Sequence, residues 1–439
     1  MGIQSLVLAT SFDPIYWNTA CLQVNSGAID IDEERNTDYG KIAKAIGDIT
    51  SKGIEVSLVD INKSSYTFIP DMGNNKILFG MKALIGVGAN VIGMIIDNRP
   101  YVSMIDFMNK TPVNKTVMVS LIKSGAFDAL ENKTRSQTMA EYIWLICDKK
   151  KRITLQNFNG LMERDMIPEG LEFQKRVFVF NKALKTYCKV GDYYLLVDNF
   201  LSFYEEFFDM DLIEIVNGRA HIRQSTWEKI YKKAMLTAGE YFKANQEEVL
   251  TAFNKVLFKE MWDKYAAGTI ASWEMSSLGF YYTEHELKDV DMARYSIVNF
   301  SDLNEEPEVD YFFRRNGKEI PIFRTVTIIG TVIAKNDTKH IVAILTTNGV
   351  VNVKFSRDHY AMFNKQISAQ RDDGTKKVME KGWFTRGTMV MVTGIRRGDQ
   401  FQAKSYKKTT NHQLYKITEV NDGKLTLIHT RYGEVHGED

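Results

Sequence analysis

Hydrophobic positions follow a helical period over most of the first two thirds of the chain. Apolar residues spaced three and four apart follow Asp38 and predict a helix from about Tyr39 to Lys52, which Gly53 ends. Between residues 66 and 150, short apolar segments alternate with Gly and Asn and predict a compact group of short helices. A longer pattern from about Gln224 to Tyr265 is typical of an amphipathic scaffold helix or pair of helices.

From Ile322 onward the hydrophobic period changes to that of β-strands. Five short β-rich segments are separated by turn signals: TVTIIGTVIA, HIVAILTT, VVNVKF, TMVMVTGI and QFQAKSY. SRDHYAMF, between the third and fourth segments, predicts a short helix. Five strands with a helix between the third and the fourth have the order of an OB-fold β-barrel. The pattern therefore predicts a multi-domain α+β protein with a C-terminal five-stranded OB-fold barrel.

These patterns divide the chain into six stretches. They are a helical and then extended part (1–65), a helical domain (66–150), a mixed and helical insert of unknown role (151–273), a connector (274–321), the barrel (322–421) and a tail (422–439). The connector is acidic, because residues 281–310 contain nine Asp or Glu against two Lys or Arg. EEPEVD within it is typical of a linker.

Composition excludes some classes of protein and leaves the binding partner open. Lys and Arg number 56 and Asp and Glu 55, so only local charge is informative. The three cysteines, Cys21, Cys147 and Cys188, are far apart and form no C-x-x-C, which argues against a disulfide framework or a zinc knuckle. No apolar run approaches the ~18–20 residues of a membrane helix, and the amino terminus lacks the basic end of a signal peptide. We therefore expect a cytoplasmic protein without membrane contact.

The strongest local motif is LIGVGANVIGMII, which runs from Leu84 to Ile96. Gly86 and Gly88 surround the apolar Val87 and allow a tight hairpin between two helices, because glycine adopts positive φ and has no Cβ to block a close neighbour. A plain corner between two helices explains the same glycines about equally well.

The helix that follows this hairpin presents free N–H groups near Gly88, Ala89 and Asn90. These groups and the helix dipole suit a phosphate oxygen. This arrangement is a helix-hairpin-helix, which binds a nucleic-acid backbone without reading its sequence. Lys82 and Arg99 flank the hairpin and are candidates for additional charge contacts.

A second copy of the motif is predicted downstream, which makes the domain a tandem helix-hairpin-helix. Residues 115–123 predict a helix, SGAF the hairpin, and residues 134–148 the final helix. The candidate contacts to the duplex backbone in this copy are Lys115, Lys123, Ser124 and Gly125.

Positive charge gathers in the barrel. Residues 351–410 contain thirteen Lys or Arg against five Asp or Glu, and aromatic residues are interleaved among them. A basic groove with stacking rings suits single-stranded nucleic acid. The candidate phosphate contacts are Lys354, Arg357, Lys404, Lys407 and Lys408, and the candidate stacking rings are Phe355 and Phe401. For each residue the alternative is that the ring fills the barrel core and the lysine is solvated.

Several motifs occur in a fixed order. They are Asp13–Ala20 (DPIYWNTA), Gly53-Ile54 with Val59–Ser64, Phe79-Gly80 with IGVG, VNK with LIKSGAFD, and LGFY with Glu284-His285. In this order they resemble the alpha subunit of bacterial DNA polymerase III, the family-C replicative DNA polymerases. The resemblance covers roughly residues 10–130 and 274–421. It implies that residues 1–65 are the end of a fingers region and that the tandem hairpins and the barrel bind DNA.

The resemblance also implies a polymerising palm, with three aspartates in a Pro-Asp-x-Asp-x-Asp setting that hold two Mg²⁺ ions. No such string occurs here. The Asp-x-Asp pairs lack the proline and the third acid, as is typical of solvated surface: Asp30 with Asp32, Asp209 with Asp211, and Asp289 with Asp291. We therefore expect no catalytic residue and no bound metal or cofactor in this chain, and Mg²⁺ at the palm of a partner.

We predict the DNA-binding C-terminal part of a split replicative polymerase, phage- or mobile-element-encoded, that acts in the cytoplasm of a bacterial host with a palm-bearing partner chain. A sliding clamp is a further candidate partner, through Gln174–Phe178 (QKRVF), a segment that an ordinary strand explains better. A free-standing DNA-binding accessory protein is the main alternative. A DNA ligase ranks last, because no Lys-x-Asp-Gly motif and no four-cysteine zinc site occur.

Overall fold

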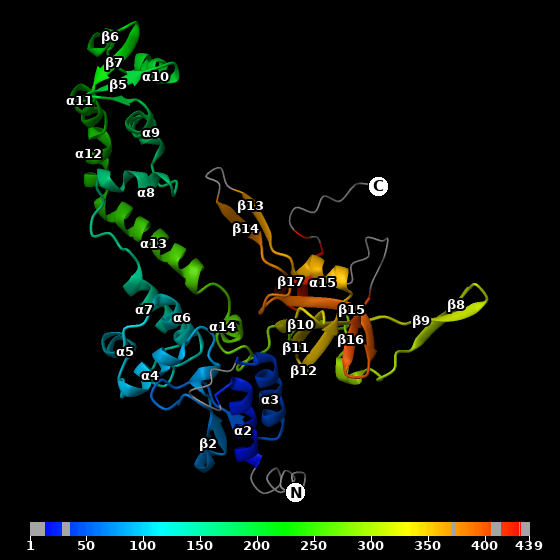
Figure 1. The fold of residues 1–439 in the computed structure, drawn as a ribbon. Coiled ribbons are helices and arrows are strands. Elements are labelled where there is room, and N and C mark those ends of the chain that lie inside the picture. The colour runs from blue at the N-terminus through cyan, green and yellow to red at the C-terminus, as the bar shows by residue number, and fades with distance from the viewer. Residues whose placement is uncertain (1–13, 29–35, 371–374, 405–413, 430, 432–439) are drawn as a thin grey trace. The chain divides into compact units, whose positions relative to one another are not determined.

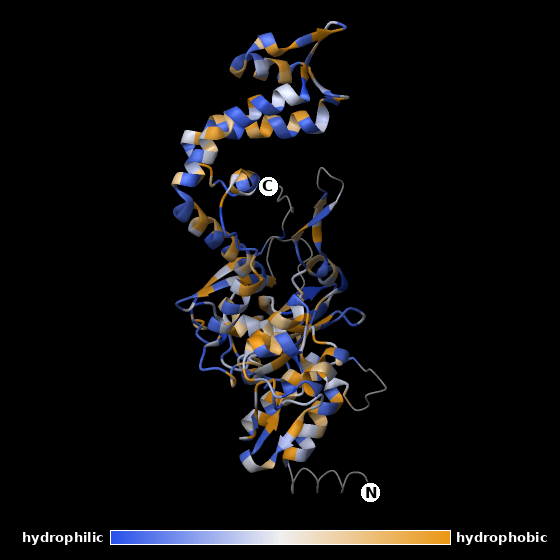
Figure 2. Cartoon of the chain, turned by 90° about the vertical axis from the view of Figure 1, so that its left-hand side faces the viewer, coloured by the Kyte–Doolittle hydropathy of each residue, from blue (hydrophilic) through white to orange (hydrophobic). Residues whose placement is uncertain are grey.

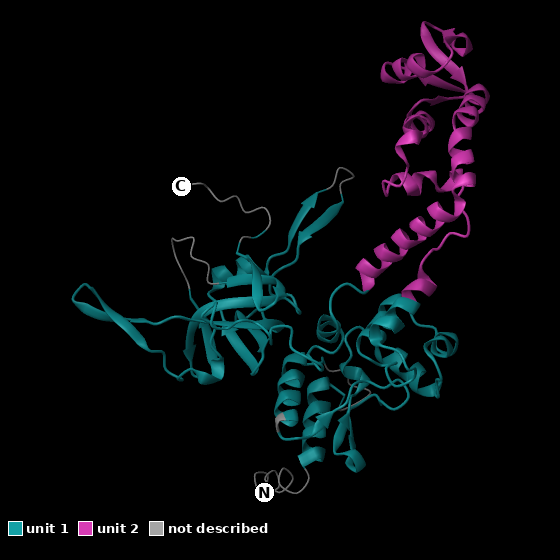
Figure 3. Ribbon diagram, turned by 180° about the vertical axis from the view of Figure 1, so that it is seen from behind, with its two compact units in different colours: residues 1–141, 266–439 teal, residues 142–265 magenta. Residues whose placement is uncertain are grey.

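The computed structural model describes residues 14–28, 36–370, 375–404, 414–429 and 431. The chain forms two compact units, one of residues 1–141 and 266–439 and the other of residues 142–265 (Figure 3). In the described residues, no helix has the length and apolar character needed to span a membrane.

The first unit begins with two helices, α2 (Pro14–Ser26) and α3 (Tyr39–Ser51), beside a small sheet (Figure 1). Asp38 caps α3 as predicted, because its side chain accepts a hydrogen bond of 3.1 Å from the N–H of Lys41. The sheet has the order β1-β3-β2, with β1 (Glu55–Val56), β3 (Lys76–Leu78) and β2 (Ile69–Asp71).

A group of short helices follows, as the alternation of apolar segments with Gly and Asn predicts. It contains the 3-10 turn η2 (Met81–Ala83) and the helices α4 (Ala89–Asp97), α5 (Met104–Lys110), α6 (Lys115–Lys123) and α7 (Arg135–Ile146). Fully buried side chains such as Ile92, Phe107 and Leu121 form its core. The helix α14 (Ile270–Ser277), distant in sequence, packs against α6.

The barrel has the predicted OB-fold order. Its strands are β10 (Val326–Asn336), β11 (Ile341–Thr346), β12 (Gly349–Lys354), β15 (Met389–Arg397) and β16 (Gln400–Ala403), with α15 (Arg357–Asn364) after the third. The pairs β10–β11, β11–β12, β15–β16 and β10–β15 are antiparallel, and a parallel β12–β16 pair closes the ring. The core includes Val332, Val353 and Trp383, each 0% exposed.

In the part of the chain that the structure describes, three hairpins extend from the barrel. β8 (Val309–Arg315) pairs with β9 (Lys318–Phe323), and β13 (Ile367–Gln370) pairs with β14 (Lys376–Glu380). The third consists of β17 (Leu414–Asn421) and β18 (Lys424–Ile428), and it joins the barrel through the β15–β17 pair. The strand β18 therefore occupies part of the stretch that the sequence pattern suggests is a tail.

The acidic connector is in part a packed segment. Leu287, Val290 and Ile297 are buried and share a core cluster with Ile329 and Met391 of the barrel. The apolar residues spaced among the acids explain why this part does not behave as a free linker. EEPEVD lies after this packed part and leads into β8.

The second unit contains helices and a four-stranded sheet of order β4-β5-β7-β6. The strands are β4 (Lys189–Val190), β5 (Tyr193–Leu196), β6 (Glu214–Val216) and β7 (Arg219–Arg223), and the helices include α8 (Phe158–Met162), α9 (Glu172–Tyr187) and α10 (Asn199–Phe207). Hydrophobic and hydrophilic residues alternate around its helices (Figure 2). Two apolar clusters form its core, one around Phe158 and Phe242 and one around Tyr204 and Trp227.

Two predictions are corrected in this unit. The pattern from Gln224 to Tyr265 forms three helices, α11 (Gln224–Ala234), α12 (Leu236–Ala244) and α13 (Gln246–Tyr265). The segment Gln174–Phe178 is neither a strand nor a free clamp-binding peptide, because it lies in α9 with Gln174 and Val177 buried. Its apolar residues, at helical rather than alternating spacing, pack into the unit's own core.

Candidate nucleic-acid interface

The first hairpin is held in place at Ile85, on the residue before its turn. The N–H of Ile85 donates to the carbonyl of Ser277 at 2.8 Å, and its carbonyl accepts from the hydroxyl of Ser120 at 2.6 Å. Val87 is 7% exposed and inserts its side chain into the protein. Because α14 and α6 both hold the backbone of Ile85, the glycines that follow have a defined position.

The turn itself faces solvent with its amides free. Gly86 has a φ of 83°, which glycine adopts readily, and Gly86, Gly88 and Asn90 are exposed. Among the described residues, no hydrogen bond uses the N–H groups from Gly86 through Asn90; the first amides of α4 that are bonded are those of Val91 and Ile92, to the carbonyl of Gly88. Free amides at the start of a helix, together with its dipole, make an anion site.

Space is open above both glycines. A Cβ added at Gly86 or at Gly88 would meet nothing within 4 Å. The geometry is therefore suited to the close approach of a phosphate from outside.

The two cations that flank the first hairpin, Lys82 and Arg99, already have partners within the protein. Lys82 is half-buried and already interacts within the protein. The guanidinium of Arg99 donates to the carbonyl of Ile61 at 2.7 Å and to that of Ser64, so it holds the loop before the hairpin. Burial lowers the pKa of Arg99 from its usual value. Arg99 thus has a structural role in this loop.

The predicted second hairpin at Ser124 and Gly125 is wrong. Ser124 is fully buried, its N–H donates to Ser120, and the N–H groups of Gly125 and Ala126 donate to Ile122 and Leu121. Gly125 has a φ of 82°, and a Cβ there would lie 2.7 Å from the guanidinium of Arg135. This glycine ends α6 in the left-handed conformation common at helix C-termini.

Lys123 is correspondingly unsuited to DNA contact. Its side chain is half-buried, which lowers its pKa, and its carbonyl accepts a hydrogen bond of 3.2 Å from Arg135. Of the two cations predicted for the second copy, Lys123 is therefore half-buried, whereas Lys115 is exposed.

The start of α6 offers a better second position. Asn114 caps the helix, because its side chain accepts from the N–H of Val117 at 2.9 Å. Lys115 and Thr116 are exposed, and no hydrogen bond within the described part of the chain uses their N–H groups. The turn of residues 111–114 separates α5 from α6 much as residues 84–88 separate η2 from α4. From the sequence, only Lys115 was predicted as a DNA contact at this position, although an asparagine before an apolar helix is a usual cap signal.

A buried ion network joins the hairpin domain to α14 and the connector. Arg135 donates to Glu274 at 3.1 Å and to Asp128 at 2.8 Å, and Glu274 is fully buried. Glu274 also accepts from the N–H groups of Tyr282 and Thr283 at 2.8 and 2.9 Å. The network positions α14, whose Ser277 anchors the first hairpin.

The two predicted stacking rings of the barrel are buried. Phe355 is 3% and Phe401 0% exposed, and both belong to the barrel core. The ring of Phe355 packs 4.8 Å from that of Phe384. Both side chains fall on the inward side of their segments, so neither is available to a base, and the core alternative is correct for them.

The basic residues of the barrel that were predicted to contact phosphates differ in exposure and in their contacts. The ammonium of Lys354 donates to the carbonyl of Lys339, whereas Arg357 is exposed at the start of α15. Lys404 is half-buried and interacts within the protein. Lys407 and Lys408 lie outside the described residues.

A basic groove that the sequence did not predict lies between α3 and the outer surface of β10–β12. Its volume is 570 Å³, and four of its lining residues are lysines: Lys41, Lys44, Lys335 and Lys339. Asp38 also lines it and pairs with Lys41 at 3.2 Å. No sequence signal could reveal this groove, because nearly three hundred residues separate its two walls.

The helix α3 is fixed to the barrel at the groove. The guanidinium of Arg386 lies 4.2 Å from the centre of the Tyr39 ring, and Ala334 lies beside Gly40 of α3. Burial raises the pKa of Tyr39 and lowers that of Arg386. The groove is therefore a built feature of the first unit.

The Asp-x-Asp pairs show no sign of a metal centre. Asp209 accepts from the N–H of Asp211 at 2.9 Å and Asp291 from that of Arg294 at 3.1 Å, as in ordinary turns. Asp30 and Asp32 lie outside the described residues. Across the described ranges, no group of three or more His, Cys, Asp or Glu is arranged to hold a metal ion.

Comparisons with known proteins agree with this geometry. A family model described as helix-hairpin-helix motif matches residues 53–138. "Probable DNA polymerase YorL" of Bacillus subtilis (strain 168) is 38% identical over 450 residues, which cover 98% of this chain and 34% of that protein. A "DNA-directed DNA polymerase" of Bacillus phage SPbeta matches equally. The chain thus spans about a third of the length of these two curated relatives.

Shorter matches extend to bacterial replicative polymerases. The "DNA polymerase III subunit alpha" of Thermus aquaticus is 35% identical over 105 residues, which cover 22% of this chain and 8% of that protein. That of Aquifex aeolicus (strain VF5) is 34% identical over 162 residues, which cover 35% of this chain and 13% of that protein. The chain is therefore similar over nearly its whole length to a phage DNA polymerase and over part of its length to alpha subunits of DNA polymerase III, and its residues 53–138 match the helix-hairpin-helix motif.

Proposed function

We propose that this chain is the DNA-holding part of a replicative polymerase of the DNA polymerase III alpha type. The observation that carries the proposal is the exposed turn of Gly86–Asn90, whose free amides open the helix α4. These amides bind a phosphate of duplex DNA, and the exposed start of α6 at Lys115 and Thr116 binds another. The contact is independent of base sequence.

The single strand lies in the basic groove between α3 and the barrel. Lys41, Lys44, Lys335 and Lys339 supply positive charge there, in a trough of 570 Å³. Phosphates of a single strand can follow such a trough without base-specific contacts. We assign the single strand to this groove and not to Phe355 and Phe401, because those two rings are buried and DNA can reach the groove.

Nucleotidyl transfer takes place elsewhere, on a palm that these 439 residues do not contain. No Pro-Asp-x-Asp-x-Asp string occurs among them. We propose a palm-bearing partner chain as the holder of the aspartates that bind Mg²⁺. The assembly works where DNA is replicated, in the cytoplasm of a bacterial host. Recovery of a palm-bearing chain in stoichiometric amount with this protein supports this arrangement. Isolation of the protein alone from its native host favours a free-standing accessory protein.

Gly88→Glu tests the duplex contact. Gly88 has extended backbone angles and open space above it, so the glutamate fits, but it places a carboxylate where a phosphate should bind. We expect affinity for a duplex of unrelated sequence to fall at least about tenfold, as for the loss of a charged contact. Gly93→Glu, at an exposed glycine of the same helix with equally open space, is the matched control. Equal effects of both substitutions, or of neither, would falsify the assignment of the turn.

A further inference from the structure

A two-stranded arm projects from the barrel and has no counterpart in the function described so far. β8 and β9 pair with each other alone (Figure 1), and every residue of β8 is exposed. Its aromatic residues are more than half exposed: Tyr311 at 56%, Phe312 at 60% and Phe313 at 52%. Clustered large apolar side chains at this exposure mark an interaction surface.

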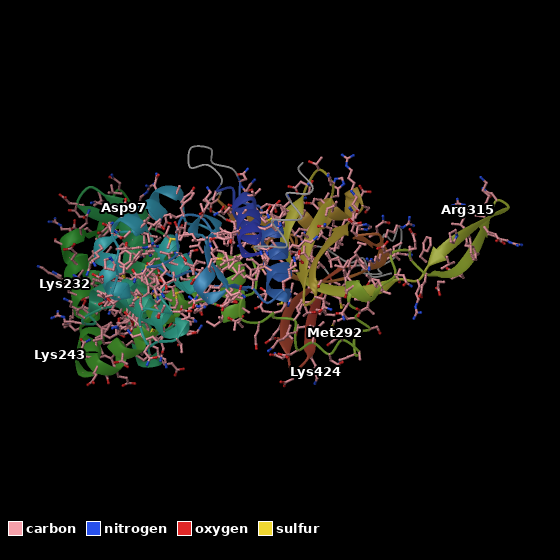
Figure 4. The ribbon with its side chains drawn as sticks, turned by 90° about the horizontal axis from the view of Figure 1, so that it is seen from below. Asp97, Lys232, Lys243, Met292, Arg315 and Lys424 are labelled. Carbon is pink, nitrogen blue, oxygen red and sulfur yellow. The ribbon has the colours of Figure 1, made fainter. Side chains whose placement is uncertain are left out.

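The arm is a preformed element. Its turn is Asn316-Gly317, with φ of 49° and 72°, which is the two-residue turn that matches the twist of paired strands. At its base, the N–H of Arg324 donates to Glu308 at 2.9 Å, and the guanidinium of Arg397 lies 5.2 Å from the Phe323 ring. Arg315 lies at the far end of the ribbon, away from the barrel (Figure 4).

The strand register sorts the side chains of the arm into two faces. Residues directly opposite each other share a face, and neighbours along a strand alternate. The pairs Tyr311–Ile322, Phe313–Ile320 and Arg315–Lys318 therefore lie together on what we call the aromatic–basic face. Phe312–Pro321 and Arg314–Glu319 lie on the opposite face.

The two faces of the arm differ in charge. Arg314 donates to Glu319 at 2.9 and 2.7 Å, so the opposite face is neutral at its tip. Arg315 and Lys318 take part in no ion pair between described residues, and the aromatic–basic face contains no carboxylate. This face thus presents two rings, two isoleucines and two cations toward the same side.

We propose that the aromatic–basic face of the arm is a stacking site for single-stranded DNA. Bases stack on Tyr311 and Phe313, and the phosphates between them lie near Arg315 and Lys318. Flat rings beside unpaired cations are what sequence-tolerant single-strand binding requires. The inference rests on the proposed role of the first unit in holding DNA.

The test compares two variants of the same arm. Labelled (dT)20 is titrated with wild-type protein, with Tyr311→Ala/Phe313→Ala, and with the matched control Phe312→Ala on the opposite face. We expect the double variant to bind at least about tenfold more weakly, because stacking on one aromatic ring contributes about five- to a hundredfold in affinity. The control should change affinity by less than about twofold, as for a ring outside a binding site.

A second measurement needs no substitution and so does not depend on the folding of a variant. Single strands containing 5-iodouracil are irradiated with the wild-type protein, and the cross-linked peptide is identified by mass spectrometry. We expect a cross-link within residues 309–315. Cross-links confined to other segments would overturn the proposal, as would equal (dT)20 affinities of the wild type and the double variant. Loss of binding to anionic vesicles with unchanged (dT)20 affinity would assign the face to a lipid surface.

These outcomes are separable from those of the hairpin. The arm variants should bind duplex DNA as the wild type does, and Gly88→Glu should leave the iodouracil cross-link unchanged. If Gly88→Glu weakens duplex binding while the double variant binds (dT)20 normally, the arm assignment fails and the proposed function stands. If the cross-link forms in the arm while Gly88→Glu has no effect, the hairpin assignment fails instead.

Discussion

The two glycines of the first hairpin have different physical roles. Gly86 has a φ of 83°, which strains any other residue, so the fold itself requires glycine there. Gly88 has a φ of −81° and a ψ of 159°, which any residue adopts, and nothing within 4 Å limits a side chain. The missing side chain at position 88 therefore has no use in the folded chain alone, and the approach of an external group explains it.

At the same scale, Glu274 should contribute strongly to stability. It is fully buried and accepts from Arg135 and from the amides of Tyr282 and Thr283. We expect Glu274→Ala to lower the free energy of unfolding by about 3–5 kcal/mol, because it removes one partner of a buried guanidinium and leaves two amides without their acceptor. Urea denaturation measures the change.

The control for this prediction is an ion pair of similar geometry on the surface. Arg164 and Glu260 lie 2.8 Å apart, but the side chain of Glu260 is 48% exposed. Glu260→Ala should cost less than about 1 kcal/mol. A loss from Glu274→Ala no greater than that from Glu260→Ala would contradict a positioning role of the buried network.

At the scale of elements, the periodic segments were predictable and the turns were less so. The barrel strands alternate clearly and are separated by turn residues, so their order followed from the sequence. The stretches around Gly86 and Gly125 look alike as sequences, yet one begins a helix with free amides and the other ends a helix with the amides of residues 124–126 bonded. Whether the helix precedes or follows the glycine decides between these two cases. That depends on packing between elements, which a local sequence pattern does not contain.

The start of α6 gives a prediction at this scale. Lys115 is exposed at the first residue of the helix, beside amides that have no partner among the described residues. We expect Lys115→Ala to weaken duplex binding for all sequences alike and to lower the slope of log affinity against log salt by about one. Titrations at several salt concentrations give the slope.

Lys110→Ala is the comparison for that slope. Lys110 ends α5, the helix before the turn, and pairs with Asp106 at 2.9 Å. It should leave the salt slope unchanged. The same decrease in both variants would mean that positive charge in general, and not the start of α6, determines the effect.

At the scale of the molecule, the first unit brings together elements that are distant in the chain. The basic groove needs α3 beside β10–β12, and the hairpin needs α14 beside α6. Neither contact could be predicted from the sequence, whereas the existence of a helical domain and a barrel could. The burial of Phe355 and Phe401 could not be predicted either, because the register within the closed barrel determines whether a ring faces inward.

The groove predicts a separation of duplex and single-strand binding. Lys44 and Lys339 line it from its two walls. We expect Lys44→Glu/Lys339→Glu to weaken binding of a single strand by about tenfold or more, since it reverses two charges along the backbone path. Duplex affinity should change by less than about twofold, because the hairpin contacts remain. A parallel loss of both affinities, seen in matched titrations, would show that the groove is not a separate single-strand path.

Hydrogen–deuterium exchange with and without duplex DNA tests the central claim most directly. The N–H groups of residues 86–90 have no hydrogen-bond partner among the described residues, and Gly86, Gly88 and Asn90 are exposed, so these amides should exchange rapidly in the free protein. We predict that saturating duplex of unrelated sequence slows their exchange, and that Gly88→Glu abolishes this protection. Unchanged exchange at residues 86–90 in protein that is demonstrably bound to duplex would contradict the account.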